Sequence, residues 1–312
     1  MERISERKII LVKRKSRLND LIVRFNSISQ ARFYIEHLGA DFEDYLKEHE
    51  EYEAAISQAE NILQNCGRVQ ALDRSFLPNF IFGKDDIVVS IGQDGLVANT
   101  LKYLNGQPLI GINPSPNRWD GVLLPFKVTD LAKVIPEVVR NKRPRKEVSM
   151  AMAKMNGGQS ILAVNDLFIG QKSHVSARYQ IKYGKNTESH SSSGIIISTG
   201  LGSTGWMKSV LTGSMSIVNK LSNKKMAINN NEKFEWSSNY LYFSVREPFP
   251  SNTTGTEIIF GKISDERPLT VESKMAENGI IFSDGIEKDF LEFNSGSSVN
   301  ITVSDRKGYL VL

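Results

Sequence analysis

The sequence predicts an α/β protein in which an N-terminal domain with a parallel sheet precedes a β-rich, β-sandwich-like C-terminal domain. Residues 85–113 read as a buried strand, a glycine-bracketed turn, a helix and a second strand, which is the βαβ order of a parallel sheet. From about residue 175, short stretches alternate apolar and polar side chains, which is typical of half-buried strands. A length of 312 residues suits one large or two ordinary domains.

The first half contains clear element signals. An apolar run at 8–12 predicts a buried first strand, and residues 19–38 are expected to be helical. A second helix over about 41–66 is indicated by apolar residues that recur at three- and four-residue steps. The βαβ unit then supplies a strand at 85–91, a helix after residue 95 and a strand at 108–113.

The second half changes character after a polar, basic run at 141–146, which we expect to be the interdomain crossing. The predicted domains are therefore 1–140 and 141–312, with the last segment free to pack back on the first domain. One helix is expected over about 207–221. Short strands are expected at 175–183, 194–199, 240–245, 256–260, 279–282, 298–303 and 309–312.

Composition excludes several classes of protein. The 39 Lys and Arg against 35 Asp and Glu give a net charge of +4, too mild to imply nucleic acid as a partner but suited to anionic ligands. The single cysteine, Cys66, leaves no intramolecular disulfide or cysteine-based zinc site. No signal peptide or membrane-length apolar run is found, so a cytoplasmic protein with no membrane partner is expected.

The turn Gly92-Gln93-Asp94-Gly95 is the first candidate for chemistry. Glycines let a backbone approach a phosphate, and the start of a helix adds partial positive charge. A carboxylate held there is able to orient an attacking hydroxyl or to hold Mg²⁺. Taken alone, the motif is more typical of an ordinary turn, because Asp and Gly are the commonest turn residues.

Two further segments place polar groups at predicted strand ends. Ser198–Trp206 contains glycines and hydroxyls between a buried strand and a helix, and Trp206 offers a ring face for a purine. Asn165-Asp166 follows an apolar strand, where an amide and a carboxylate suit ribose hydroxyls. In isolation the first segment could also be a flexible connector, and the second an Asx turn.

Taken in order, Gly92–Gly95, Asn165-Asp166 and Thr199–Trp206 resemble the hallmark motifs of the NAD kinase family. The likeness is greatest to its mitochondrial-type branch, through Asn165–Gly170 and Ser192–Gly194, and it covers roughly residues 85–290. The resemblance implies an NAD kinase/diacylglycerol kinase-like fold with an N-terminal nucleotide-binding domain. It also implies transfer of a phosphoryl group from ATP, another nucleotide or polyphosphate to the adenosine-ribose 2′-hydroxyl of NAD.

The resemblance assigns roles to individual residues. Asp94 would be the catalytic carboxylate, and Mg²⁺ or another divalent cation would accompany the donor without a dedicated set of protein ligands. A homodimer or tetramer is expected by analogy. The residues implied in nucleotide binding are Lys13, Gly92, Gln93, Gly95, Asn165, Asp166, Thr199, Gly202, Ser203, Thr204 and Trp206.

Three departures from the family pattern leave alternatives open. Gln93 replaces a glycine, Asp166 replaces a glutamate, and Leu201 stands where a threonine is usual. The Gln93 side chain either crowds the phosphate or donates a hydrogen bond to it. A related lipid or sugar kinase and a non-catalytic nucleotide or NAD sensor therefore remain as alternatives, as do NAD and NADH as substrates.

Overall fold

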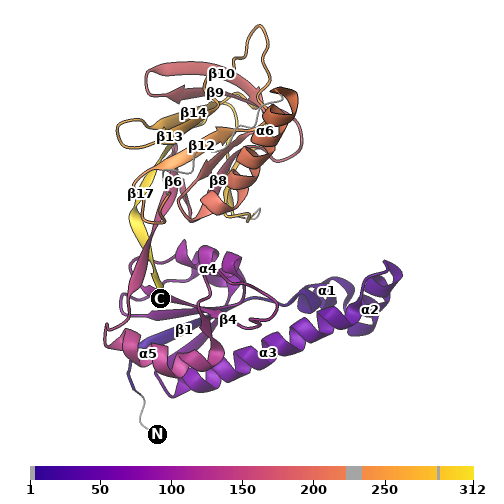
Figure 1. Ribbon diagram of the computed structural model, residues 1–312, viewed down its shortest axis with the longest axis vertical. Coiled ribbons are helices and arrows are strands. Elements are labelled where there is room, and N and C mark those ends of the chain that lie inside the picture. Colours follow the sequence, from indigo (N-terminus) through magenta and orange to yellow (C-terminus); the bar gives the residue numbers. More distant parts are fainter. Residues whose placement is uncertain (1–3, 223–233, 287–288) are drawn as a thin grey trace. The chain divides into compact units, whose positions relative to one another are not determined.

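A computed structural model describes residues 4–222, 234–286 and 289–312 (Figure 1). The chain forms two compact units. The first holds the chain up to Lys146 together with Gly308–Leu312, and the second holds Glu147–Lys307. Within these described ranges, no helix has the length and apolar character that crossing a membrane requires.

The first unit is built on a parallel sheet, as the βαβ pattern predicted. Its order is β2-β1-β3-β4, with β5 and the end of β17 paired to β4, and every pairing is parallel. All residues of β3 and β4 are buried, which explains why their sequences are largely apolar and do not alternate with polar residues. The strands are β1 (Lys8–Lys13), β2 (Arg68–Asp73), β3 (Ile87–Ile91), β4 (Pro108–Asn113) and β5 (Phe126–Lys127).

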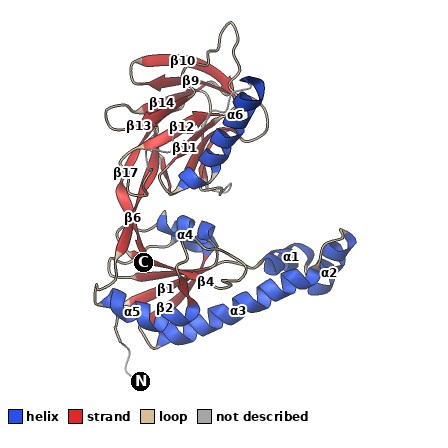
Figure 2. Cartoon of the chain, viewed as in Figure 1, coloured by secondary structure: helices blue, strands red, loops and turns tan. Residues whose placement is uncertain are grey.

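Helices cover both faces of this sheet (Figure 2). The helices α3 (Phe42–Gln64) and α5 (Leu131–Val139) pack on one face and share a single apolar core with β1, β3 and β4. On the opposite face lies α4 (Asp94–Leu101), which follows β3 directly. The turn between β3 and α4 therefore sits at the carboxyl edge of the sheet, where open α/β sheets bind ligands.

The expectation of one helix over 19–38 is wrong. The structure has two, α1 (Arg17–Phe25) and α2 (Ile28–His37). Asn26 takes a left-handed backbone with φ of 63°, and the Ser27 hydroxyl accepts from the Gln30 amide to begin the second helix. These local hydrogen bonds end one helix and start the next although the apolar spacing continues.

The second unit is a β-sandwich, as expected. One sheet contains β10, β9, β14, β17, β6 and β7, and the other has the order β13-β12-β11-β8-β15-β16. Their inward side chains form one apolar core. The strands are β6 (Arg145–Met155), β7 (Ser160–Ala163), β8 (Asp166–Gln171), β9 (Ala177–Tyr183), β10 (Asn186–Ser192), β11 (Ile195–Ser198), β12 (Leu241–Val245), β13 (Phe260–Ile263), β14 (Leu269–Ser273), β15 (Gly279–Ser283), β16 (Phe290–Glu292) and β17 (Ser298–Val311).

Two strand expectations need correction. The strand expected at 256–260 is β13, which only begins at Phe260. The two strands expected at 298–303 and 309–312 are the single strand β17. Its first part pairs antiparallel with β14, and Tyr309 and Leu310 pair parallel with β4. The polar residues between the two apolar stretches stay extended because each end of the strand has its own pairing partner.

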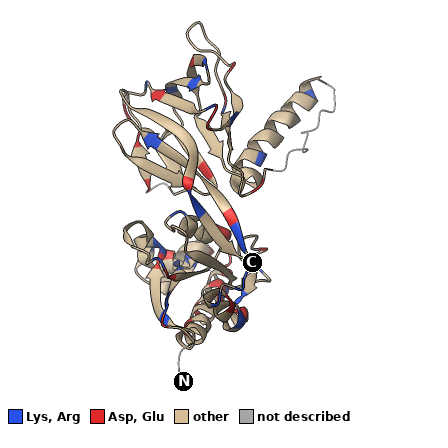
Figure 3. Ribbon diagram, turned by 90° about the vertical axis from the view of Figure 1, so that its left-hand side faces the viewer, with Lys and Arg blue, Asp and Glu red and all other residues tan. Residues whose placement is uncertain are grey.

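The helix expected at 207–221 is confirmed as α6 (Trp206–Ser222). Its first turns pack on the outer face of the second sheet, where Met207 is buried with Phe168 and Ile196. Ile217 and Leu221 in its last turns are exposed. The helix carries two lysines and no acidic residue, and it is largely uncharged in Figure 3.

Candidate active site

The Gly92–Gly95 turn lies between β3 and α4, and the buried strand fixes where it begins. The Gly92 amide donates to the Ile112 carbonyl at 3.2 Å, so the turn is bonded to the end of β4. Asp94 is the first residue of α4, where a carboxylate is favoured by the helix dipole. A partly exposed carboxylate thus stands at the carboxyl edge of the parallel sheet.

Both oxygens of Asp94 already accept hydrogen bonds. Oδ1 accepts from the Leu123 amide at 2.9 Å, and Oδ2 accepts from the Val122 amide at 3.1 Å. These bonds tie the segment after β4 to the turn. An ionised carboxylate has about four acceptor positions, so Asp94 is still able to accept a further hydrogen bond from a hydroxyl.

The two glycines and the glutamine around Asp94 have different surroundings. A Cβ on Gly92 would lie 3.0 Å from a methyl carbon of Leu96, so glycine permits close packing there. A Cβ on Gly95 would meet nothing within 4 Å, which leaves open space beside the helix start. Gln93 precedes the helix with an extended backbone and makes no capping bond, so its side-chain amide is not used in the cap.

A basic residue does stand beside the turn, but it is not Lys13. Lys13 lies 3.8 Å from Glu60 of α3 in an ion pair. Arg14 packs against Gly92 instead, because its Nε would be 3.7 Å from a Cβ at that position. Its guanidinium lies over the Tyr52 ring at 5.1 Å and donates to Glu48 at 3.0 Å. Of the two consecutive basic residues, Arg14 is thus the one whose side chain contacts the turn.

Tyr52 links the ends of two strands. Its hydroxyl accepts from the Arg14 amide and donates to the Ile91 carbonyl, both at 3.0 Å. Burial raises the pKa of Tyr52 to about 12, so the hydroxyl keeps its proton and remains a donor. The end of β1 is thereby held beside the start of the Gly92 turn.

Glu48 anchors the charged side chains behind Tyr52. It is only 3% exposed and accepts from both Arg14 and Arg17. Burial alone would raise its pKa, but hydrogen bonds and charges from Arg17 and Arg14 outweigh burial, so the pKa of Glu48 is lowered. Arg17 also contacts Asp44 at 2.8 Å, and Asp44 in turn pairs with Arg118 of the segment after β4. The network connects α1, α3 and that segment.

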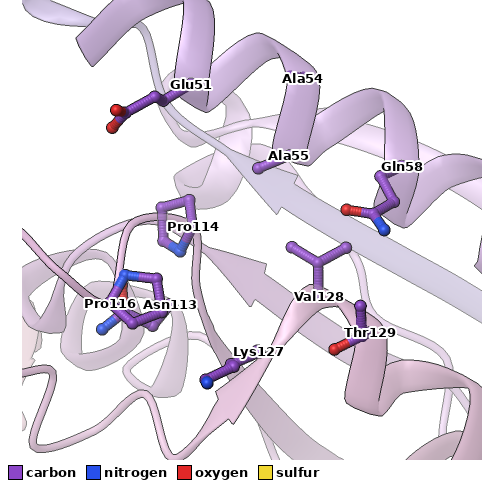
Figure 4. A pocket seen from close by; sticks show the side chains of 10 residues that line it. All are labelled: Glu51, Ala54, Ala55, Gln58, Asn113, Pro114, Pro116, Lys127, Val128 and Thr129. Atoms are coloured by element: carbon purple, nitrogen blue, oxygen red, sulfur yellow. The ribbon is translucent and has the colours of Figure 1, made fainter. Parts of the chain in front are cut away.

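Two hollows of the first unit lie between α3 and the residues after β4. One cavity of about 400 Å³ and a second of about 440 Å³ share Glu51, Pro114 and Pro116 in their walls. Figure 4 shows Glu51 and Gln58 on the helix and Lys127 and Thr129 across the first cavity. Neither cavity includes a residue of the Gly92 turn. We place the candidate site at the turn, because there a carboxylate stands beside glycines and the backbone amides at the start of a helix, a combination that suits a phosphate-bearing substrate.

In the second unit, Asn165, Asp166 and Thr199 come together. Thr199 is fully buried, and its hydroxyl donates to the Val164 carbonyl at 2.5 Å. The same oxygen accepts from the Gly202 amide at 3.2 Å, and the Thr199 amide donates to the Asn165 carbonyl. The Thr199 hydroxyl therefore braces the backbone: its proton is already donated to Val164, and one acceptor lone pair remains for the ligand contact expected of it.

Asp166 is the one carboxyl-bearing residue among these three, and its pKa is perturbed. Burial, and secondarily the charge of Asp284, raises the pKa of Asp166 to about 7, while hydrogen bonding with Ser198 acts against this. Its Oδ1 is buried and has no hydrogen-bond partner among the residues that the structure describes. A Cβ on Gly202 would approach this oxygen to 2.8 Å, so only glycine fits above it. A buried acceptor without a partner is a position that a ligand hydroxyl could satisfy.

Asp284 is a site residue that the sequence reasoning missed. Its carboxylate accepts from the backbone amides of Val164, Asn165 and Asp166. The sequence contains a sign of it, because the pair Asp284-Gly285 comes just after a predicted strand, as the Gly92–Gly95 turn does. It lies outside the three motifs, so they do not point to it.

The remaining predicted residues have mixed surroundings. The Ser203 hydroxyl donates to the Gly200 carbonyl at 2.7 Å, and Thr204 is exposed. Trp206 stacks on Phe168 with ring centroids 5.8 Å apart, and the Arg246 guanidinium lies 5.6 Å from its ring. Trp206 therefore contributes to packing as well as presenting an aromatic surface.

Metal ligation by protein side chains alone finds no support. In the parts of the chain that the structure describes, no group of three or more His, Cys, Asp or Glu side chains is placed to hold an ion. Mg²⁺ commonly keeps several waters and is bound through one or two carboxylates with substrate phosphates. The donor set therefore fits only a cation that arrives with its phosphate ligand.

Comparison with solved structures supports the fold. The chain is similar to yeast NADH kinase complexed with NADH, with a TM-score of 0.59 and 14% sequence identity over 98% of this chain and 84% of that one. It is also similar to an NAD kinase from Archaeoglobus fulgidus in complex with ATP, with a TM-score of 0.55 and 16% identity over 98% of this chain and 93% of that one. No family model and no curated protein matches at the level of sequence.

Proposed function

We propose that this chain is an NAD kinase, which transfers a phosphoryl group from ATP or another donor to the adenosine-ribose 2′-hydroxyl of NAD or NADH. One observation carries the proposal. In a fold similar over 98% of its length to an NADH kinase and an NAD kinase, Asp94 stands in a glycine-bracketed turn at the carboxyl edge of the parallel sheet. Because one fold can host several activities, the proposal rests on the chemistry of the residues at this site as well as on the fold.

Asp94 would orient the attacking hydroxyl and accept its proton. The two backbone amides that it binds hold the carboxylate in one orientation, which suits a group that must meet a hydroxyl at hydrogen-bond distance. Phosphoryl transfer depends mainly on positioning and charge neutralisation, so one carboxylate and backbone amides suffice on the protein side. Mg²⁺ would neutralise charge on the donor phosphates.

Gly95 and Gln93 would serve the donor. The open space at Gly95 lets a phosphate approach the amides at the start of α4. The Gln93 amide, which makes no capping bond, is able to donate to a phosphate oxygen. Arg14 packs behind this turn and contributes positive charge there.

Asn165 and Asp166 would bind NAD. Asp166 has an acceptor oxygen without a partner, and the side chain of Asn165 makes no hydrogen bond to another described residue. Thr199 and Gly202 would act through the backbone that they brace. Trp206, with one ring face on Phe168, would supply aromatic contact area.

A non-catalytic NAD sensor is the rival that one observation favours. Both oxygens of Asp94 are engaged with Val122 and Leu123, as they would be if the residue served only to hold that segment. A related lipid or sugar kinase has the turn in common but no need for the Asn165-Asp166 pair.

A direct assay separates these functions. The purified chain is incubated with Mg²⁺, with NAD or NADH, and with ATP or polyphosphate, and the product is measured with an NADP-specific dehydrogenase. Formation of NADP or NADPH is the expected result. Binding of NAD without product would favour the sensor, and label transfer from ATP to a lipid or sugar but not to NAD would favour the related kinases.

A further inference from the structure

Three consecutive backbone amides converge on one carboxylate in the second unit. Asp284 Oδ1 accepts from Asn165 at 2.7 Å and from Val164 at 3.1 Å, with a longer bond of 3.3 Å from Asp166. Its other oxygen also lies 3.1 Å from the Val164 amide. The Asp284 amide in turn donates to the Asp166 carbonyl at 2.9 Å. The turn that carries Asn165 and Asp166 is therefore tied to Asp284 from both directions.

Strand pairing brings Asp284 to this position. It directly follows β15, which pairs antiparallel with β8 so that Ser283 stands opposite Leu167. Asp284 adopts a left-handed backbone with φ of 54°, which aspartate tolerates better than most residues. This conformation, followed by Gly285 at φ of 69°, ends the strand beside the start of β8.

We propose that Asp284 is the positioning residue for the Asn165–Asp166 pair, holding through its carboxylate the backbone from which both NAD-binding side chains extend. This inference rests on the proposed function, because it takes these two residues as NAD ligands. Asp284 itself need not touch the nucleotide. Its carboxylate accepts hydrogen bonds from three consecutive backbone amides, and this is the contact through which it would act.

The charge of Asp284 has a second effect on the same pair. The groups that act on the Asp166 carboxyl are Ser198 from β11, the Gly202 backbone above it and Asp284 from the turn after β15. Burial raises the pKa of Asp166, and the negative charge of Asp284 raises it further, to about 7. Because an ionised carboxylate accepts from ribose hydroxyls, Asp284 also sets the pH range in which NAD binds well.

Two variants and a matched control test the proposal. Asp284→Ala removes both anchor and charge, whereas Asp284→Asn keeps the size and one acceptor oxygen but removes the charge. Asp265→Asn is the control, since Asp265 is an exposed aspartate in a turn of the same unit. Two measurements are made on the full chain. Hydrogen exchange is followed in peptides covering residues 160–170, and the KM for NAD is measured from pH 5.5 to 9.

The expected results differ between the variants. Exchange in the 160–170 segment should rise at least tenfold in Asp284→Ala, and the KM for NAD should rise by about tenfold, as loss of charge-assisted hydrogen bonds implies. In Asp284→Asn the midpoint of the pH dependence of KM should move to lower pH. A purely structural role would leave that midpoint where it is, and Asp265→Asn should change neither quantity.

Failure of the proposal and failure of the proposed function are distinguishable. Unchanged exchange in Asp284→Ala, or an unchanged KM and midpoint in an enzyme that forms NADP, would overturn the positioning role and leave the kinase intact. A wild-type protein that neither binds NAD nor forms NADP would overturn the assignment of Asn165 and Asp166 as NAD ligands. The exchange measurement would still decide whether Asp284 holds the turn.

Discussion

The Asp94 carboxylate accepts a hydrogen bond from the Leu123 backbone amide at 2.9 Å, across 29 positions of sequence. The bond joins the start of α4 to the segment that follows β4. Asp94 therefore has a structural role in addition to the chemical one proposed for it. A substitution at this position has to be measured for both.

Asp94→Asn is expected to lose NADP formation by about 10²–10⁴-fold, because the proton acceptor is removed while the shape is kept. One of the two amides that it binds also loses its acceptor, since the side-chain NH₂ group only donates. This should lower the free energy of unfolding by about 1 kcal/mol. Steady-state kinetics and urea unfolding on the same preparation measure both effects.

Asp120→Asn is the matched control for this variant. Asp120 is an exposed aspartate in the same segment, so its replacement should leave turnover and stability unchanged. An Asp94→Asn enzyme with full activity would sink the mechanism. Lost activity with no change in stability would instead show that the bonds to Val122 and Leu123 contribute little.

Trp206→Ala is expected to lower stability and to raise the KM for NAD. Its ring stacks on Phe168, so truncation removes apolar contact worth roughly 1–3 kcal/mol. If the exposed part of the ring also contacts the adenine, the affinity for NAD should fall by about 1–3 kcal/mol. Trp206→Phe keeps most of the packing and should show a much smaller loss in unfolding experiments. A normal KM in the alanine variant, with lowered stability, would confine Trp206 to packing.

Much of the fold could be predicted because the burial of each strand or helix determines its sequence pattern of apolar and polar residues. β3 and β4 lie inside a covered parallel sheet, and their largely apolar, non-alternating sequences indicate this. The break at Asn26 could not be predicted from spacing, because a left-handed residue and a serine cap decide it locally. The single strand β17 was divided in two for a related reason, since its polar middle resembles a loop until both pairing partners are known.

The candidate site shows the same division between local and long-range information. The Gly92–Gly95 turn is local and was found from its residues. The contact of Arg14 with the turn depends on Glu48, which lies 34 positions away on a buried helix face. Asp284 reaches Asn165 across 119 positions through strand pairing. Pairings of this kind follow from the topology, so a single sequence does not reveal them.

Glu48→Gln tests the network that supports the turn. Replacing the buried carboxylate leaves Arg14 and Arg17 without their shared counter-charge, which should lower the free energy of unfolding by about 2 kcal/mol at pH 7. This figure is below that for a fully buried pair because Arg17 is 42% exposed. Glu50→Gln, at an exposed position of the same helix, should leave stability unchanged.

The lowered pKa of Glu48 determines the direction in which its contribution to stability changes with pH. The pKa of Glu48 is lowered below its ordinary value of 4.5, because the hydrogen bonds and charges of Arg17 and Arg14 outweigh burial. The stabilisation is therefore fully present above pH 4.5 and is lost as the pH falls through the lowered folded-state pKa. Urea unfolding from pH 3 to 7 should show wild type and Glu48→Gln converging only at the acid end. A constant difference at every pH would contradict an ionic role for Glu48.

Asp166→Asn should stabilise the protein near neutral pH while weakening NAD binding. Burial and the Asp284 charge raise the pKa of Asp166 from 3.8 to about 7, so between these values the folded chain holds a proton that the unfolded chain has released. Stability of the wild-type protein should therefore fall as pH rises from about 4 to 7 and stay low above that range.

Asparagine carries no charge, so the Asp166→Asn variant does not lose this stability. We estimate the difference at about 1–2 kcal/mol after screening by solvent at this partly exposed position. Urea unfolding at pH 5 and pH 8 should show the variant gaining more stability over wild type at the higher pH, while its KM for NAD rises because an acceptor for ribose hydroxyls is gone. Equal pH slopes in the two proteins would mean that Asp166 ionises as readily in the folded chain as in the unfolded one, and its place as a perturbed ligand of NAD would then have to be abandoned.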